Sequence, residues 1–220
     1  MCIRDSNGAI PKGARLLHEA QSLPLADIIS DVNQWSNNVM AQQVFLTLGR
    51  LSPARVDAVT APRGPLTPVR TGRFERSREV VLRWWTQTFG IHTRAPVLEN
   101  GAGLSREERI TPDALVALLR HAATHANGER FVQSLSVAGV SGTAARYARA
   151  PDSAARGNAW LKTGTLNNVV GVAGYVQAVN GQRYAVVGII NHPNAGAGRP
   201  ALDALVAVSY THLTLPTSDL

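Results

Sequence analysis

Two short polar segments of this 220-residue chain carry the side-chain types that acyl transfer requires. The first is Ser36-Asn37-Asn38, which sets a hydroxyl and an amide two residues apart, and the second is Lys162-Thr163-Gly164-Thr165. An enzyme that transfers an acyl group through serine needs an activated hydroxyl, a proton route to the leaving group, an oxyanion hole and a grip on the substrate. The two segments can supply the last three of these needs.

The first segment stands just before a run with helical spacing, Met40 to Leu48. Ser36 would relay a proton to the leaving amine, because a hydroxyl donates and accepts a hydrogen bond at once. Asn38 would hold a peptide group of the substrate and contact a nearby lysine. Serine and asparagine are also common helix caps, so the same pair is consistent with a purely structural role at the start of that helix.

The second segment follows an alternating stretch in which Trp160 and Lys162 share one face of a strand. Lys162 would place a positive charge at the edge of a cleft, and Thr163 would donate its hydroxyl to a substrate carboxylate. Gly164 would let the substrate backbone approach the strand, and Thr165 would offer its backbone N–H to the developing oxyanion. The alternative is a solvated lysine on an edge strand followed by a turn glycine.

Neither segment contains a nucleophile activated by a neighbouring lysine. No serine has a lysine three residues later, and the residues three before the two lysines, Lys12 and Lys162, are Ala9 and Ala159. Since removing a nucleophile costs orders of magnitude in rate, we expect this chain to be catalytically silent by itself.

Helices and strands must bring these two distant segments together. Apolar positions at helical spacing predict helical structure over Leu23–Gly49, with Gly49 as its stop, and a second helix over Arg73–Phe89. Thr111 and Pro112 are a typical helix start, for a helix that runs to about His125. A short apolar element is expected over Phe131–Val137, and Ala201–Val208 can begin a final helix. Between them we expect three strands, over Ala159–Thr165, Val169–Val179 and Arg183–Asn191, with a hairpin turn at Asn180-Gly181. The pattern predicts an α/β fold.

The composition narrows the class of protein. The hydrophobic fraction of 45% and the charged fraction of 17% are typical of a globular domain. The net charge is +7, but the arginines are scattered and no aromatic platform lies between them, so the sequence does not favour nucleic-acid binding. Cys2 is the only cysteine, which excludes a disulfide framework, and no apolar run is long enough for a transmembrane segment. His121 and His125 are four residues apart, but without a third ligand nearby we expect no metal and no organic cofactor.

The two segments, with a helical region between them and a strand meander after them, resemble the serine enzymes that react with penicillin. More specifically, the chain resembles the D-Ala-D-Ala carboxypeptidase/endopeptidase family, the class C low-molecular-mass penicillin-binding proteins. Leu98–Arg106 is similar to that family's Asp-Gly-Ser-Gly-Leu-Ser-Arg segment. Ser134–Thr143 is similar to its Ser-Leu-Pro-x-Ala-Gly-x-Asp-Gly-Thr segment, and Leu161–Tyr175 to its Lys-Thr-Gly strand and the next one. The similarity covers about residues 14–207.

The chain departs from this family pattern at several positions. Asn100 and Ala102 replace an aspartate and a serine, and Ser141 stands where aspartate is common. Loss of a carboxylate at position 100 could weaken a hydrogen-bond network near the cleft. The larger departure is the missing Ser-x-x-Lys, which in this family lies far upstream of Ser-x-Asn.

The resemblance implies a β-lactamase/transpeptidase-like fold, an antiparallel sheet flanked by helices, incomplete at its N-terminal side. It implies a parent hydrolase of the serine-type peptidase class. That protein would cleave peptidoglycan stem peptides ending in D-Ala-D-Ala in the cell wall, through an acyl-serine intermediate, with β-lactams as inhibitors. Its place would be the periplasm or outside the membrane, although the chain shows no signal peptide. Two alternatives remain open: a non-catalytic cell-wall binder, and a related serine hydrolase such as a β-lactamase or esterase.

The two ends of the chain differ in character from the rest. Residues 1–6 and 209–220 resemble translated sequencing-adaptor read-through. We therefore expect both to be artefactual tails that pack poorly, and the stretch between them, residues 7–208, to be the C-terminal part of a penicillin-binding transpeptidase-like domain.

Overall fold

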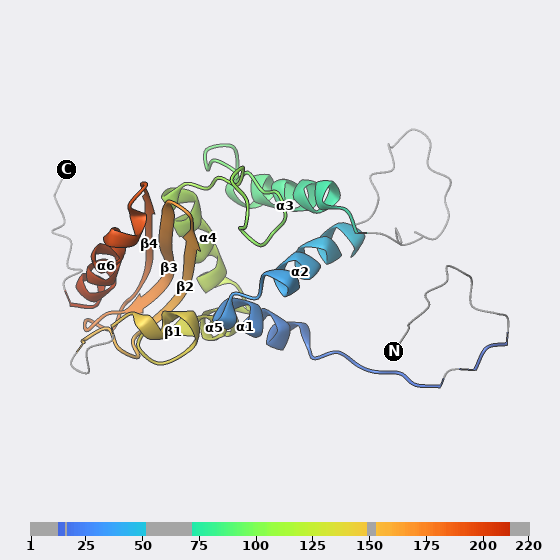
Figure 1. Cartoon of the computed structure of the whole chain (residues 1–220), viewed down its shortest axis with the longest axis horizontal. Coiled ribbons are helices and arrows are strands. Elements are labelled where there is room, and N and C mark those ends of the chain that lie inside the picture. Colours follow the sequence, from blue (N-terminus) through green and yellow to red (C-terminus); the bar gives the residue numbers. More distant parts are fainter. Residues whose placement is uncertain (1–12, 16, 52–71, 149–152, 212–220) are drawn as a thin grey trace.

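The computed structural model describes residues 13–15, 17–51, 72–148 and 153–211. Within them, one antiparallel sheet has its strands side by side in chain order (Figure 1). Its strands are β1 (Ser136–Val137), β2 (Ala159–Leu166), β3 (Val169–Gln177) and β4 (Arg183–Asn191). The predicted class, an antiparallel sheet flanked by helices, is confirmed.

Six α-helices and two short 3₁₀ turns are described around this sheet. They are α1 (Leu25–Trp35), α2 (Asn38–Leu51), α3 (Phe74–Phe89), α4 (Pro112–Thr124), α5 (Gly128–Ser134), η1 (Gly142–Arg146), η2 (Ala195–Gly198) and α6 (Arg199–Thr211). The expected start of α4 is confirmed, because the Thr111 hydroxyl accepts a hydrogen bond from the Ala114 N–H at 3.2 Å. The apolar element expected over Phe131–Val137 is divided between α5 and β1.

The strands follow from the alternation of their side chains. On β2, Leu161 is buried on one face and Trp160 packs on the other, as the alternation predicts. The predicted hairpin between β3 and β4 is present, with Gly181 at a φ of 80°. A glycine adopts this conformation at little cost, which explains the tight turn.

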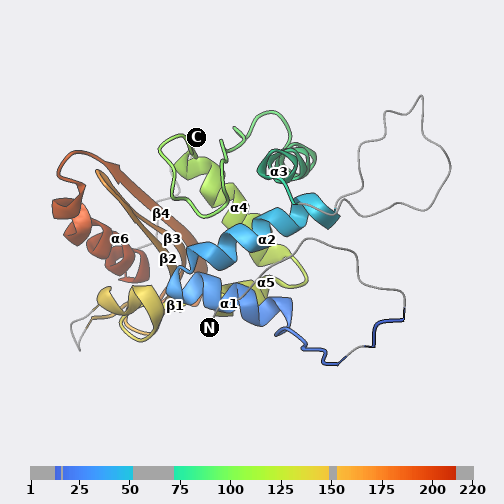
Figure 2. The ribbon, with the colours of Figure 1, turned by 45° about the vertical axis from the view of Figure 1, so that its right-hand side comes forward.

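Each face of the sheet is covered by helices (Figure 2). On one face α6 packs against β3 and β4 over a core that includes Leu161, Val176 and Val206. On the other face α4 and α5 enclose a smaller core around Val132 and Tyr175. The Tyr175 hydroxyl donates to the Leu119 carbonyl at 2.6 Å, which satisfies its polar atom, and burial raises the pKa of this phenol to about 12.

The helical stretch expected over Leu23–Gly49 is two helices, and the break falls at the first polar segment. Ser36 ends α1 in a left-handed conformation, with φ 55° and ψ 45°. The cap of α2 is Asn37, whose Oδ1 accepts a hydrogen bond from the Met40 N–H at 3.1 Å. The alternative that Ser36 or Asn38 caps the N-terminus of this helix is therefore wrong, because Asn37 has that role.

Gly49 was expected to stop the helix, and that expectation is wrong. It lies inside α2 and is buried against α3, where a Cβ would be only 2.6 Å from the Ser77 hydroxyl. The glycine thus allows close approach of two helices. The two helices are also joined by Phe45 and Phe74, whose ring centroids are 6.3 Å apart.

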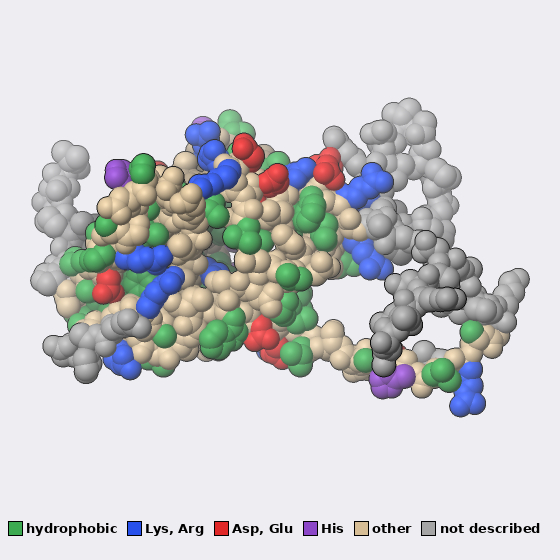
Figure 3. Space-filling model, viewed as in Figure 1, with side chains coloured by type: hydrophobic (Ala, Val, Ile, Leu, Met, Phe, Trp, Pro, Cys, Tyr) green, Lys and Arg blue, Asp and Glu red, His purple; other side chains and the backbone are tan. Residues whose placement is uncertain are grey.

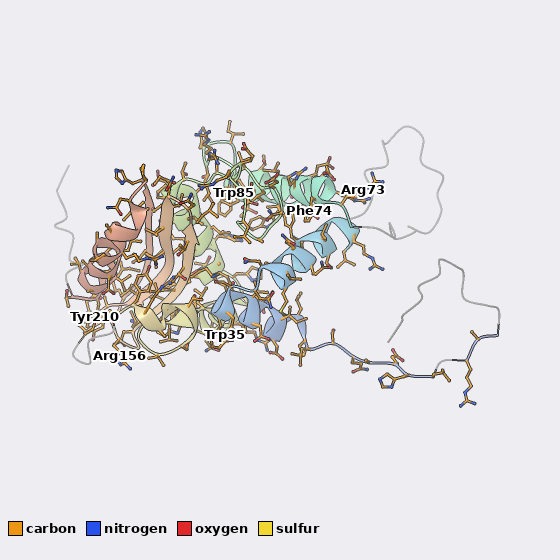
Figure 4. All side chains as sticks on the ribbon, viewed as in Figure 1. Trp35, Arg73, Phe74, Trp85, Arg156 and Tyr210 are labelled. Carbon is orange, nitrogen blue, oxygen red and sulfur yellow. The ribbon has the colours of Figure 1, made fainter. Side chains whose placement is uncertain are left out.

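The expectation that residues 209–220 pack poorly is wrong for residues 209–211. Helix α6 continues to Thr211, and the Ser209 side chain is buried. The Tyr210 carbonyl accepts a hydrogen bond from the Val179 N–H at 3.1 Å, and Figure 4 shows Tyr210 at the end of α6 beside the sheet. Packing of its apolar side against the sheet stabilises this last turn of the helix. Residues 1–6 and 212–220 lie outside the described part.

Candidate active site

Ser36 and Lys162, which are 126 positions apart in the sequence, meet in space. The Lys162 ammonium donates a hydrogen bond to the Ser36 Oγ and a second one, at 3.2 Å, to the Thr163 carbonyl. Ser36 comes from the end of α1 and Lys162 from β2. The structure thus brings together the serine and the lysine that the sequence analysis singled out, while the catalytic roles given to them stay predictions.

The end of α1 is fixed by contacts that the sequence analysis did not identify. The Asn33 side chain donates to the Ser134 hydroxyl at 2.7 Å, and the Ser136 hydroxyl donates to the Gln34 carbonyl at 3.1 Å. Gly142 packs against the same place, because a Cβ on it would lie 2.5 Å from the Gln34 carbonyl oxygen. The segment Ser134–Thr143 therefore fixes the position of the helix end that carries Ser36.

The ammonium of Lys162 has an unusual electrostatic environment. Burial lowers its pKa, and the positive charge of Arg146 lowers that pKa further. In the described part of the chain it contacts a hydroxyl and a carbonyl but no carboxylate. A lysine with a lowered pKa gives up a proton more readily than an exposed one, which is consistent with the proton-relay role predicted for Ser36 beside it.

The outer edge of β2 is open beyond its first residues. β1 pairs only with Trp160 and Leu161, and the Ala138 N–H donates to the Ala159 carbonyl just before them. Since alternate residues of a strand direct their backbone groups to the same edge, Thr163 and Thr165 face outward. No described backbone group binds them there, so the Thr165 N–H is free for an oxyanion or a peptide strand.

The two residues between Lys162 and Thr165 differ in accessibility. Gly164 is exposed, and no atom lies within 4 Å of the place that a Cβ would take, so a substrate backbone can come close. The Thr163 hydroxyl is buried, donates to Thr143 Oγ1 at 3.0 Å and accepts from the Arg146 guanidinium at 3.2 Å. Thr163 therefore makes its hydrogen bonds within the protein, and direct donation to a substrate requires it to leave Thr143.

A cleft of about 840 Å³ lies over the α4 side of the sheet and reaches the Lys162–Thr165 part of β2. Its floor is formed by β2, β3 and the end of β4, including the tetrad Lys162–Thr165, and its wall by residues 103–110 and Leu115. Figure 3 shows a hollow in this part of the molecular surface, between the sheet and the helices. The volume is within the range of small-molecule sites, about 300–1,000 Å³.

The wall of the cleft is ordered by its own side chains. The Glu108 carboxylate accepts hydrogen bonds from the Glu99 and Asn100 N–H groups, at 3.0 and 3.1 Å. Asn100 Oδ1 accepts from the Ala102 N–H at 2.9 Å, so this amide does part of what a carboxylate at position 100 would do. Ser105 stabilises the turn of this wall, since its Oγ accepts from the Glu107 N–H at 3.0 Å.

Asn38 is the predicted site residue with the least contact. It is the first residue of α2 and is half-exposed. Lys162 binds Ser36 and Thr163 rather than Asn38, so the expected contact of this amide with the lysine is not seen. Its side-chain amide has no hydrogen-bond partner among the described residues, which leaves it available to a ligand.

The described residues contain no group of three or more His, Cys, Asp or Glu side chains placed to hold a metal ion. His121 and His125 have ring centroids 6.3 Å apart, but His121 packs edge-on against Trp84 and Phe89. This contact accounts for His121 as a packing residue. None of the helices in the described ranges is long and apolar enough to cross a membrane.

Solved structures define the class of this fold. Penicillin binding protein 4 (dacB) of Haemophilus influenzae, in complex with a β-lactam, superposes with a TM-score of 0.67 at 23% identity, over 86% of this chain and 41% of that one. The Bd3459 predatory endopeptidase of Bdellovibrio bacteriovorus superposes with a TM-score of 0.60 at 18% identity, over 85% of this chain and 45% of that one. The fold is that of the penicillin-binding, transpeptidase-like proteins.

The sequence comparison is more specific. The model of the D-Ala-D-Ala carboxypeptidase 3 (S13) family matches residues 6–211, and the chain belongs to this family. The D-alanyl-D-alanine carboxypeptidase of Actinomadura sp. (strain R39) is 28% identical over 93% of this chain and 37% of its own length. Carboxypeptidase DacB of Mycolicibacterium smegmatis is 29% identical over 90% of this chain and 40% of its own length. The chain spans about two fifths of the length of these relatives, and the resemblance seen in the sequence is confirmed.

Proposed function

We propose that this chain is the proton-relay and substrate-binding part of a serine-type D-Ala-D-Ala carboxypeptidase/endopeptidase. Its substrates are peptidoglycan stem peptides that end in D-Ala-D-Ala, and β-lactams are its inhibitors. The observation that carries the proposal is the hydrogen bond from the Lys162 ammonium to the Ser36 Oγ beside an open strand edge and a cleft of about 840 Å³. The relatives named as carboxypeptidases support it.

The nucleophile in this proposal belongs to a Ser-x-x-Lys segment that the printed sequence does not contain. Its serine attacks the carbonyl of the penultimate D-alanine and forms an acyl-serine, and the terminal D-alanine leaves as an amine. Ser36 and Lys162 pass a proton to that amine, a role supported by the hydrogen bond that the Lys162 ammonium donates to the Ser36 hydroxyl. Water then hydrolyses the acyl-serine and releases the shortened peptide.

The remaining site residues bind the substrate. The peptide lies along the open edge of β2, where the Thr165 N–H donates to the developing oxyanion. Gly164 leaves room for the peptide backbone, and the free amide of Asn38 holds a peptide group of the substrate. No step requires a metal or an organic cofactor. Because its substrate is cell-wall peptidoglycan, we place the parent protein in the periplasm or elsewhere outside the cytoplasmic membrane.

A fluorescent penicillin tests this function. The chain as printed should give no denaturation-resistant label, and the protein extended by its own upstream coding sequence, through the Ser-x-x-Lys segment, should be labelled. Label on the printed chain would show another nucleophile and would overturn the assignment. An extended protein that contains no Ser-x-x-Lys and binds D-Ala-D-Ala peptides without label would establish the alternative, a non-catalytic cell-wall binder.

A further inference from the structure

Two arginines bracket the open edge of β2 on the side that faces α6. Thr163 and Thr165 are two residues apart, so their side chains point to the same face of the sheet. Arg146, the last residue of η1, donates to the Thr163 hydroxyl at 3.2 Å. Arg199, the first residue of α6, donates to the Thr165 hydroxyl at 3.0 Å. Segments far apart in the sequence thus bring two guanidinium groups to adjacent positions of one strand edge.

Among the described residues, neither guanidinium is paired with a carboxylate. The ion pairs of the described residues join Arg78 to Glu75 and Arg183 to Glu129, and neither pair includes Arg146 or Arg199. Among the carboxylates of this region, Asp203 accepts a hydrogen bond from the Ala148 N–H at 2.9 Å. Glu107 and Glu108 line the cleft beside the same strand, and Glu108 accepts from the Glu99 and Asn100 N–H groups. Arg146, Arg199 and Lys162 are therefore cationic side chains at this edge without an ion-paired partner among the described residues. Arg106 lies on the wall of the cleft and donates to the Asn167 carbonyl at 2.7 Å. Figure 3 shows basic side chains gathered in this part of the surface with few acidic ones.

Among the described residues, the two guanidinium groups keep free donors, whereas the neighbouring Thr163 hydroxyl does not. A guanidinium has five N–H donors, and each of the two donates one hydrogen bond to a threonine. The Thr163 hydroxyl is buried and donates to Thr143. Arg146 and Thr165 are exposed and Arg199 is half-exposed. An anion that arrives from solvent therefore meets the arginines and Thr165 first.

We propose that Arg146 and Arg199, together with the Thr165 hydroxyl, bind the carboxylate of the residue that leaves the substrate. The proposal rests on the proposed function and adds to it the residues that make a free carboxylate on the leaving residue a requirement. A scissile carbonyl held at the Thr165 N–H places that carboxylate one residue away, about 3.3 Å along the strand direction. Arginine suits this role because its planar fork matches a carboxylate.

This arrangement assigns Thr163 a different part from the one expected from the sequence. Its hydroxyl holds the Arg146 guanidinium in place by accepting its hydrogen bond, while the guanidinium contacts the substrate. Thr163 is then a positioning residue. The carboxylate also places a negative charge near Lys162, whose ammonium has no such partner in the described part.

Binding of two peptides to the chain as printed tests the inference. The probes are a diacetyl-L-lysyl-D-Ala-D-Ala peptide and the same peptide with a C-terminal amide, and calorimetry measures both dissociation constants. The wild-type chain should bind the acid about tenfold more tightly than the amide. Arg146→Gln and Arg199→Gln should each weaken acid binding by about three- to fivefold, as for a solvent-exposed charge contact. The double variant should bind both peptides alike, and amide binding should not change in any variant.

Two controls separate this role from charge loss and from misfolding. Arg83→Gln, on the exposed side of α3, removes the same charge far from the edge in sequence and fold and should leave both constants unchanged. Arg146→Lys and Arg199→Lys keep the charge without the fork and should restore only part of the preference. Full loss of the preference in Arg83→Gln would show that net charge alone is responsible and would overturn the inference.

The remaining outcomes distinguish this inference from the proposed function. If the wild-type chain binds acid and amide equally, the arginine site is refuted and the proposed function stands. If it binds neither peptide, the proposed function fails, and NMR titration with N-acetyl-D-alanine decides the arginine site. Shifts of the Thr165 amide and of the Arg146 and Arg199 Nε–H signals would support it, and unchanged signals would overturn it.

Discussion

Gly142→Ala tests whether the segment after β1 holds the end of α1 and thereby Ser36. Gly142 has a φ of 53°, and a Cβ there would lie 2.5 Å from the Gln34 carbonyl oxygen and still closer to the Ser136 hydroxyl. Those two groups form the hydrogen bond that ties the segment to α1. An alanine must therefore push the segment away from the helix end that carries the serine.

The structure provides a matched control for this variant. Gly157 also has a positive φ, 76°, but no atom lies within 4 Å of its missing Cβ. Gly157→Ala should lower the free energy of unfolding only by the cost of a left-handed alanine, about 1–2 kcal/mol. Gly142→Ala should lower the free energy of unfolding by this amount and by roughly a further 1–3 kcal/mol from overpacking. The additional loss corresponds to a melting temperature about 2–12 °C below that of Gly157→Ala.

Urea unfolding and thermal melts of both variants measure the difference, and D-Ala-D-Ala peptide binding adds a functional readout. Gly142→Ala should weaken peptide binding, because it displaces Ser36, and Gly157→Ala should not. Equal stability losses in the two variants would refute the packing of Gly142 against α1. Unchanged peptide binding in a clearly destabilised Gly142→Ala would show that this segment does not position the site.

Three further predictions concern Lys162, Thr163 and the C-terminal end. Lys162→Met should stabilise the chain at neutral pH relative to wild type. Because burial lowers the pKa of Lys162, the unfolded chain binds more protons than the folded chain, and the free energy of unfolding of the wild type should rise with pH toward the ordinary lysine pKa. The stabilities of wild type and variant should therefore converge in urea unfolding between pH 7 and 10, and a constant difference would contradict this. In the protein extended upstream through its Ser-x-x-Lys segment, Thr163→Val should lower turnover of the acid-terminated peptide but not of the amide-terminated peptide. Equal losses of turnover on both peptides would mean that Thr163 has a purely structural role. Deletion of residues 212–220 should leave the melting temperature unchanged, whereas deletion from 209 should lower it because Ser209 is buried; equal effects would refute the boundary.

The strands and most helices were predictable because their signals are local. The alternation in β2 and the Asn180-Gly181 turn each depend on a few neighbouring residues, and the structure has both where they were expected. The start of α4 was predictable for the same reason, since its cap lies three residues from the N–H that it binds. The break between α1 and α2 was not predicted, and the cap of α2 was sought in Ser36 or Asn38 rather than Asn37, because three polar neighbours are equally suited to that role.

The parts that were missed depend on contacts between distant segments. Gly49 was interpreted as a helix stop because nothing local shows that Ser77 packs against it. The approach of Ser36 to Lys162 was expected from the family pattern, but its supports at Ser134, Ser136 and Gly142 were not. The partners of Arg146 and Arg199 were equally invisible, since each arginine and its threonine are 17 and 34 positions apart.

The central claim is that Ser36 and Lys162 act as one proton-relay unit. A double-mutant cycle with Ser36→Ala and Lys162→Ala tests it, with the rate of acylation by penicillin measured in the protein extended through its Ser-x-x-Lys segment. Each single substitution should slow acylation by about 10²–10³-fold, the loss typical of one electrostatic contact in an active site. The double variant should be hardly slower than the worse single variant, because residues that act as a unit are lost together. Losses that multiply to about 10⁵-fold, or a single variant that acylates near the wild-type rate, would contradict the account.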